Sequence, residues 1–305
     1  MSPKKPTLAV LNLTGCTGCV ISILDLHEEI LEVLEKVDLI YCTTILDIKE
    51  IPSCDIALIN GTISNEHDIE IVKEAEKKIE KIIALGSCAC FGGIAGLRNY
   101  FKSEKVLECA YELAPTNDAG LIPSKDIPPL TEYVEVLESE IRIDYKIPGC
   151  PPLPSMIKTT LIDILDGKEP IIPTRNLCAE CDKIHESMLN PTKEFITFRV
   201  NAPYEIDYRE DLCFLEQGIL CIGFATREGC KGRCVKANLP CRGCMGPLEK
   251  EKDQGCASIT GLSSIFPIGQ LIKQEDLSGT VYRYSLPFSI LHEVHKKQKG
   301  GKNGD

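Results

Sequence analysis

Several features that would point to common protein functions are missing from this sequence. Tryptophan is absent and aromatic residues make up only 6% of the chain, so stacking platforms for nucleic-acid bases are not supported. The formal net charge of −11 also argues against a phosphate-binding face, and we expect no nucleic-acid partner. No apolar run approaches the roughly 18 residues of a membrane span, and no export signal is visible, so a cytoplasmic location is expected.

The motifs of several enzyme classes are missing as well. Directly after the first apolar run the glycines are Gly15 and Gly18, which do not form the Gly-x-Gly-x-x-Gly fingerprint of a dinucleotide site. No Ser-His-Asp or Cys-His arrangement can be recognised among the 5 histidines. Neither a nicotinamide or flavin site nor a hydrolytic triad therefore follows from the sequence.

Cysteine, by contrast, is abundant, with 17 in a chain of 305 residues. A chain of this length with 43% hydrophobic residues can build a core without disulfides. Cytoplasmic thiols stay reduced and serve mainly as metal ligands or redox groups. The cysteines therefore indicate metal or redox chemistry.

The first half of the chain alternates between strand-like and helix-like patterns. Near-continuous apolar runs, typical of parallel strands buried on both faces, cover residues 8–13, 39–44, 56–59, 82–85 and 143–147. Helical spacing fills the intervals, so we predict a doubly wound α/β domain over residues 1–165. A second domain over residues 166–305 is predicted to be irregular and helical, with residues 282–291 packing back on the body.

One group of cysteines follows the predicted strands. Cys16 and Cys19 come after the first strand, Cys88 after the fourth and Cys150 after the fifth. Open α/β sheets bind ligands at the carboxyl ends of their strands, so these four side chains are expected to converge on one site. Cys90 is a rival to Cys88 at this site.

A second group lies in the irregular half, where regular periodicity fades. It has eight members, and iron–sulfur cubanes commonly take four thiolates each, so two four-cysteine sites fit the number: Cys178, Cys181, Cys213, Cys221, Cys230, Cys234, Cys241 and Cys244. Zinc is the alternative, but zinc ribbons place their two Cys-x-x-Cys pairs roughly 15–20 residues apart, and these pairs lie much further apart. His185 follows Cys181 closely and is a weaker candidate for contact with a metal centre.

The remaining cysteines are interpreted without metal. Cys42, Cys54 and Cys109 fall in strand-like or helix-like runs and are predicted to be small core residues. Cys256 lies on a predicted helix and completes no set of four.

The first group resembles the framework of NiFe-hydrogenase small subunits. The matching runs are Gly15–Cys19, Gly86–Cys88 with Gly92-Gly93, and Pro148–Pro152. The resemblance implies a flavodoxin-like domain in which Cys16, Cys19, Cys88 and Cys150 hold a proximal 4Fe-4S cluster facing the partner's NiFe centre. Respiratory complex I relatives share this half but generally lack the second.

The second half is similar to the two-cluster domain of the same family. By this resemblance Cys178, Cys181, Cys213 and Cys221 hold a distal 4Fe-4S cluster. Cys230, Cys234, Cys241 and Cys244 hold a medial one. Many relatives have a 3Fe-4S centre at the medial position, with proline where Cys234 stands, so Cys234 implies a complete 4Fe-4S cluster here.

The segments Gly92–Asn99, Pro240–Cys244 and Asp253–Gly255 resemble more narrowly the methanogen hydrogenases that do not reduce coenzyme F-420. That resemblance implies an electron-relay subunit with no bond-breaking residue of its own. Its partners would be a large NiFe subunit, a small 2Fe-2S subunit and a heterodisulfide reductase.

Two alternatives stand beside this interpretation. A subunit of the F-420-reducing hydrogenase would be expected to carry Cys-x-x-Cys-x-x-Cys runs near its C-terminus, which this sequence lacks. A zinc-stabilised scaffold is the other.

Overall fold

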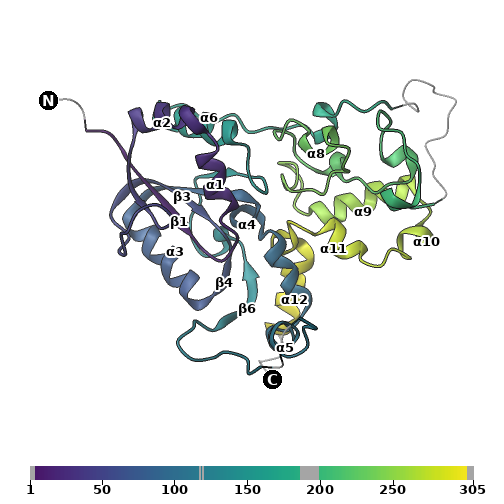
Figure 1. The fold of residues 1–305 in the computed structure, drawn as a ribbon, viewed down its shortest axis with the longest axis horizontal. Helices are drawn as coiled ribbons and strands as arrows, with labels where there is room; N and C mark the ends of the chain where they lie inside the picture. Colours follow the sequence, from purple (N-terminus) through teal and green to yellow (C-terminus); the bar gives the residue numbers. More distant parts are fainter. Residues whose placement is uncertain (1–3, 117, 119, 186–198, 301–305) are drawn as a thin grey trace. The chain divides into compact units, whose positions relative to one another are not determined.

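The chain folds into two compact units (Figure 1). The computed structural model describes residues 4–116, 118, 120–185 and 199–300. One unit is Met1–Ile171 together with Leu286–Asp305, and the other is Ile172–Ser285. The predicted boundary after residue 165 falls at the end of helix α6 (Pro154–Leu165), whereas the units divide after Ile171. The residues from Leu286 onward group with the first unit, although the prediction placed them with the second.

A five-stranded parallel sheet forms the centre of the first unit. The strand order is β2-β1-β3-β5-β7, which is 2-1-3-4-5 when only the parallel strands are counted, the flavodoxin-like order. The predicted fold class is confirmed, and each of the five predicted strand segments overlaps one of these strands: β1 (Thr7–Asn12), β2 (Asp38–Cys42), β3 (Cys54–Asn60), β5 (Ile79–Leu85) and β7 (Tyr145–Ile147).

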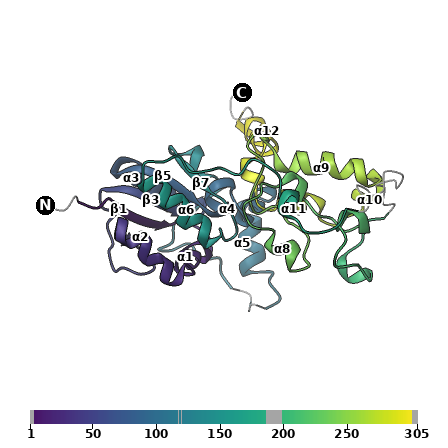
Figure 2. The same ribbon diagram turned by 90° about the horizontal axis from the view of Figure 1, so that it is seen from above.

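Side chains of the central strands alternate between two apolar layers. Leu8 and Val10 of β1 pack with α1 (Gly18–Leu24), α2 (Ile30–Lys36) and α6. Ala9 and Leu11 face the opposite layer, which includes Val72 of α3 (Glu66–Lys78). Figure 2 shows α3 on one side of the sheet and α1 with α2 on the other. Both faces of the sheet are therefore buried, as the continuous apolar strands require.

Helix α3 illustrates how the sequence sets an element's limits. The Asn65 side chain accepts a hydrogen bond from the Asp68 N–H, and the Asp68 carboxylate accepts one from the Asn65 N–H, which forms a capping box. Lys77 and Lys78 occupy the last turn, where positive charge favours the helix dipole.

A two-stranded antiparallel sheet, which the sequence analysis did not predict, lies beside these layers. It pairs β4 (Ile63–Asn65) with β6 (Leu130–Glu135). A strand as short as β4 leaves no alternating pattern to recognise. The other short elements of this unit are η1 (His27–Glu29), α4 (Gly86–Phe91), η2 (Ile94–Tyr100), α5 (Ser103–Tyr111) and η3 (Leu137–Ser139).

The first unit is completed by η8 (Leu286–Phe288) and helix α12 (Ile290–Gly300). Glu135 of β6 forms ion pairs with two residues of α12. Its carboxylate lies 3.4 Å from His292 Nε2 and 2.6 Å from Lys296 Nζ. Burial alone would raise the pKa of Glu135, but the hydrogen bonds from His292 and Lys296 outweigh it and lower that pKa below its ordinary 4.5.

We predict that the docking of α12 weakens as the pH falls below about 4.5. A carboxylate with a lowered pKa stabilises the fold above its unfolded pKa and loses this contribution as the pH falls through its folded value. Amide hydrogen exchange, expressed as protection factors, should show about tenfold lower protection of α12 when Glu135 is protonated. Glu135→Gln should give the low protection at every pH, whereas Glu293→Gln, an exposed change on the same helix, should leave the wild-type pH profile.

The second unit has little regular structure. Its described elements are η4 (Leu177–Glu180), η5 (Pro203–Glu205), η6 (Leu215–Gln217), η7 (Gly223–Ala225), α8 (Arg233–Lys236), α9 (Gln254–Ile265), α10 (Ile268–Leu271) and α11 (Leu277–Val281). This confirms the irregular and helical character predicted for it. Within the described parts of the chain, no helix combines the length and the apolar character needed to span a bilayer.

Candidate metal centres

The first candidate site is built by three chain segments that follow strands at the carboxyl edge of the sheet. Cys16 and Cys19 follow β1, Cys88 lies on α4 directly after β5, and Cys150 follows β7. Hydrogen bonds join these segments to one another. The Ser22 hydroxyl on α1 donates to the Pro152 carbonyl at 2.6 Å, and the Ser87 N–H donates to the Gly149 carbonyl at 2.8 Å.

Two glycines make room for the thiols of this site. Gly86 has φ +85°, and a Cβ there would lie 2.3 Å from Cys19 Sγ. Gly93 has φ +59°, and a Cβ there would lie 2.4 Å from Cys88 Sγ. The backbone thus approaches both sulfurs more closely than any side chain would allow, as expected for a site in which peptide groups surround a sulfur-bound group.

The four thiols of the first site are close enough to influence one another. Burial, followed by the charges of Cys88, Cys150 and Cys16, raises the pKa of the Cys19 thiol to about 12. Burial, followed by Cys150 and Cys16, raises the pKa of Cys88 to about 11. Four thiols that disfavour one another's ionisation are stabilised as thiolates when a cationic metal group binds between them.

Cys90, the rival to Cys88, has a different environment. It is completely buried in the apolar layer that includes Ala84, and its thiol donates to the Ala84 carbonyl at 3.4 Å. Among the causes that raise the pKa of Cys19, Cys90 comes after Cys88, Cys150 and Cys16. These observations favour Cys88 as the ligand.

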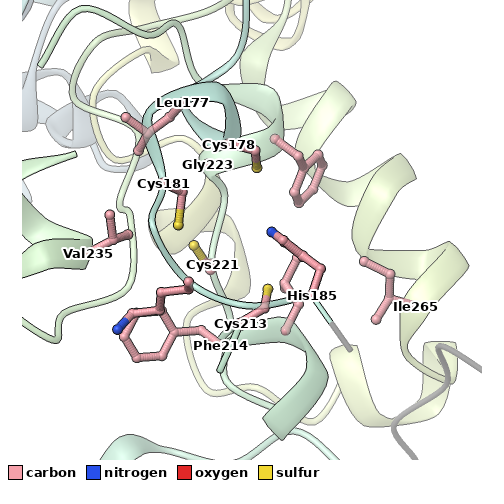
Figure 3. A pocket seen from close by; sticks show the side chains of 13 residues that line it. Leu177, Cys178, Cys181, His185, Cys213, Phe214, Cys221, Gly223, Val235 and Ile265 are labelled. Carbon is pink, nitrogen blue, oxygen red and sulfur yellow. The ribbon is translucent and has the colours of Figure 1, made fainter. Parts of the chain in front are cut away.

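The second candidate site surrounds a cavity of about 440 Å³ in the second unit. Cys178, Cys181, Cys213 and Cys221 line it, and Figure 3 shows their sulfur atoms directed into the same space. A liquid water occupies roughly 30 Å³, so this space fits a multi-atom group rather than a lone ion. Within the described residues, no three His, Cys, Asp or Glu side chains are arranged around a single ion.

The thiols that line this cavity affect one another's pKa, as the thiols of the first site do. Burial, followed by the charges of Cys221, Cys181 and Cys213, raises the pKa of Cys178 to about 12. Burial also raises the pKa of Cys213 to about 11, against the backbone hydrogen bonds of Leu215 and Glu216. The residues therefore fit a cluster that takes four thiolates.

The cavity also has a lining that the sequence analysis only partly anticipated. His185 lies beside the four cysteines in Figure 3, and Phe214 and Ile265 add apolar walls. Lys183 is buried and holds its Nζ 4.9 Å from the centre of the Phe214 ring. In the sequence, the available indication of Lys183 was its position among cysteines. The spacing of the cysteines alone gave no reason to choose it as a site residue.

The third candidate set of ligands consists of two pairs of cysteines that are close in the sequence: Cys230 with Cys234, and Cys241 with Cys244. Cys234 is among the groups whose charge acts on the Cys230 thiol, and Cys221 and then Cys244 are among those whose charge acts on the Cys241 thiol. Burial raises the pKa of Cys230 above its ordinary value and that of Cys241 well above it. The assignment of both pairs to one medial cluster stays a prediction.

The third set is in direct contact with the second. The Cys241 N–H donates to Cys221 Sγ at 3.3 Å, and the Ile222 N–H donates back to the Cys241 carbonyl at 3.1 Å. Backbone pairing thus places a predicted medial ligand against a predicted distal one.

The other cysteines are divided between core and surface. Cys42 and Cys54 are buried, as predicted for small core residues, and Cys54 donates to the Ile56 carbonyl at 3.0 Å. The prediction for Cys109 was wrong, because α5 buries none of its residues and Cys109 is exposed. Cys256 is exposed on α9.

Comparison with known proteins agrees with this architecture. The family model described as NADH ubiquinone oxidoreductase, 20 Kd subunit, matches residues 16–164. A solved NAD+-reducing NiFe hydrogenase in the H2-reduced state is 33% identical with a TM-score of 0.53, and the match covers 56% of this chain and 96% of that one. A NiFeSe hydrogenase from Desulfovibrio vulgaris Hildenborough, 19% identical over 82% of this chain and 96% of that one, has a TM-score of 0.53 and supports the fold alone.

The sequence relatives are more specific. A vhu-type F420-non-reducing hydrogenase subunit of Methanocaldococcus jannaschii is 40% identical, over 95% of this chain and 99% of the relative. The corresponding F420-non-reducing hydrogenase subunit of Methanothermobacter marburgensis is 34% identical, over 97% of this chain and 99% of the relative. The F420-non-reducing hydrogenase iron-sulfur subunit of Archaeoglobus profundus is 32% identical, over 94% and 98%.

The flavodoxin-like sheet, with cysteines at its carboxyl edge, and these matches define the class as NiFe-hydrogenase small subunits, which are electron-transferring parts of an oxidoreductase. Within that class, the chain belongs to the family of F420-non-reducing hydrogenase iron-sulfur subunits. The resemblance inferred from the cysteine motifs is thereby confirmed.

Proposed function

We propose that this chain is a three-cluster electron relay that accepts electrons from H2 oxidation at the NiFe centre of a large subunit. Cys16, Cys19, Cys88 and Cys150 hold the proximal 4Fe-4S cluster. Cys230, Cys234, Cys241 and Cys244 hold the medial one, and Cys178, Cys181, Cys213 and Cys221 the distal one. Each cluster, when bound, supplies reversible one-electron transfer.

The observation that carries the proposal is the cavity lined by Cys178, Cys181, Cys213 and Cys221. These four thiols come from three segments of the second unit, with Cys178 and Cys181 on the same one, and face one space of about 440 Å³. An apolar wall around such a space excludes water and sets the potential of the bound group. The three hydrogen-bonded segments at the sheet edge give the first site comparable support.

The partners follow from the relatives. Their names describe hydrogenase subunits, so a large NiFe subunit is the first partner. We further propose a small 2Fe-2S subunit and a heterodisulfide reductase as the route onward, in the cytoplasm. The protein's own contribution would be the spacing, burial and hydrogen bonding of the thiolates.

A metal and acid-labile sulfide determination on the anaerobically purified native complex tests the cluster number. About 12 iron and 12 sulfide per copy of this chain, after subtraction of clusters on co-purified subunits, would support three 4Fe-4S clusters. Nickel in the same complex would support the hydrogenase assembly. About two zinc per chain without sulfide would refute the relay and favour a scaffold.

The role of Cys234 gives a separate prediction. It is exposed on α8, four residues after Cys230, and supplies the fourth ligand of the proposed medial cluster. Cys234→Pro should remove about one iron per chain and convert this centre to 3Fe-4S, with an EPR signal in the oxidised state. Cys256→Ala is the control. Unchanged iron in Cys234→Pro would remove Cys234 from the ligand set.

A further inference from the structure

The segment Gly92–Asn99 contains no cysteine, but it directly follows α4, the helix that carries Cys88. Two of its glycines pack against the ring of Pro287. A Cβ on Gly92 would lie 2.2 Å from Pro287 Cγ, and one on Gly96 would lie 2.4 Å from Pro287 Cδ. Only glycine at both positions leaves space for the proline ring. We call the space formed by Gly92 and Gly96 the Pro287 socket.

The socket is closely connected to Cys88. The Gly92 N–H donates to the Cys88 carbonyl at 2.9 Å and closes the last turn of α4. The next residue, Gly93, is the one whose Cβ would meet Cys88 Sγ. A displacement at the socket is therefore transmitted within two residues to the thiol.

The residue after Pro287 contacts two of the cysteine-bearing segments. The Phe288 ring lies edge-on to Phe91, the last residue of α4, with ring centres 5.3 Å apart. Lys146 Nζ lies 4.7 Å from the centre of the Phe288 ring and 5.7 Å from that of Phe91. Lys146 belongs to β7, which leads to Cys150, so these three side chains join the Cys88 and Cys150 segments.

The same segment is anchored a second time through β6. Asn99 accepts from the Val134 N–H at 2.8 Å and donates to the Val134 carbonyl at 2.9 Å. The next residue along β6, Glu135, holds His292 and Lys296 of α12. Contacts thus run in a closed circuit from α4 through Gly92–Asn99, β6 and α12 back to Pro287.

We infer that residues 286–296 act as a clamp that positions Cys88 relative to the other thiols of the first site. This inference rests on the proposed function in that Cys88 is taken as a cluster ligand. Pro287 and Phe288 are positioning residues, because their contacts with Gly92, Gly96 and Phe91 act on Cys88 through α4. The clamp also gives a physical reason for the glycines of the Gly92–Asn99 segment.

The test uses Phe288→Ala in the native, anaerobically purified complex, with Phe288→Tyr as the conservative variant. Leu291→Ala, an exposed change in the clamp, is the matched control. The EPR signal of the first site, identified as the one lost in Cys150→Ala, is followed together with the rate of iron loss to a chelator. In Phe288→Ala we expect a shifted or broadened signal and loss of about four of 12 irons at up to about ten times the wild-type rate.

Phe288→Tyr and Leu291→Ala should both retain the wild-type signal and rate. If the Phe288→Ala complex fails to assemble, Pro287→Ala, which only empties part of the socket, decides by the same two measurements. A wild-type signal and rate in these variants, or equal iron loss from all sites, would overturn the clamp. Failure of the proposed function would be distinguishable, because the wild-type complex itself would then lack the iron and sulfide of three clusters.

Discussion

Replacement of Cys150 by alanine is expected to stop electron flow from H2 to an external acceptor while leaving part of the H2/D2 exchange intact. Cys150 follows β7, and burial and the charge of Cys16 raise its pKa, which indicates that it lies near the other thiols of the first site. Changes to residues that merely support a ligand cost about 10–100-fold, so loss of a ligand should exceed about 100-fold. The exchange reaction needs only the partner's site and no electron exit.

The two activities must be measured on the same assembled complex. Cys256→Ala removes an exposed thiol that belongs to no predicted set, and it should behave as wild type in both assays. Equal loss of exchange and acceptor reduction in an assembled Cys150→Ala complex would count against a relay.

The second large effect is expected for Gly86→Ala. Residue 86 has φ +85°, and its new Cβ would lie 2.3 Å from Cys19 Sγ, so the thiol would be displaced. Gly167→Ala is a matched control, because Gly167 has φ +71° but nothing within 4 Å of its Cβ position. Both variants carry the backbone cost of about 1–2 kcal/mol, but only Gly86→Ala meets a sulfur.

Iron analysis separates the two contributions. In Gly86→Ala the iron content should fall from about 12 to about 8 per chain, and the EPR signal of the first site should be lost. Gly167→Ala should keep both the iron content and the signal. If the two variants lose iron equally, backbone strain rather than approach to Cys19 is responsible, and the packing argument for this glycine is wrong.

The sequence predicted the sheet well because buried parallel strands leave a continuous apolar signal. All five strands of the main sheet were found from runs such as Leu8–Leu13, and their carboxyl ends located Cys16, Cys19, Cys88 and Cys150. Strand β4 was missed because three residues carry no period. Cys109 was misplaced because a cysteine on a helix gives no sign of which side faces solvent.

The sequence predicted less about the candidate sites, because it does not show which distant residues come together. The number of cysteines indicated two sites in the second unit, but it is the folded structure that shows Cys178, Cys181, Cys213 and Cys221 around one cavity. The Pro287 socket joins residues nearly two hundred positions apart, and such pairings leave no trace in local spacing. Local patterns indicate candidate ligands, whereas distant packing decides what holds them in place.

The hydrogen bond from the Cys241 N–H to Cys221 Sγ has a consequence for how the second unit acquires its metal. A thiolate accepts hydrogen bonds more strongly than a thiol, so a group that deprotonates Cys221 also fixes the peptide bearing Cys241. With Cys221 and Cys241 in different proposed clusters, filling either site changes the affinity of the other, and thermodynamic reciprocity makes the two factors equal. The two proposed sites should therefore not load independently of each other when iron is limiting.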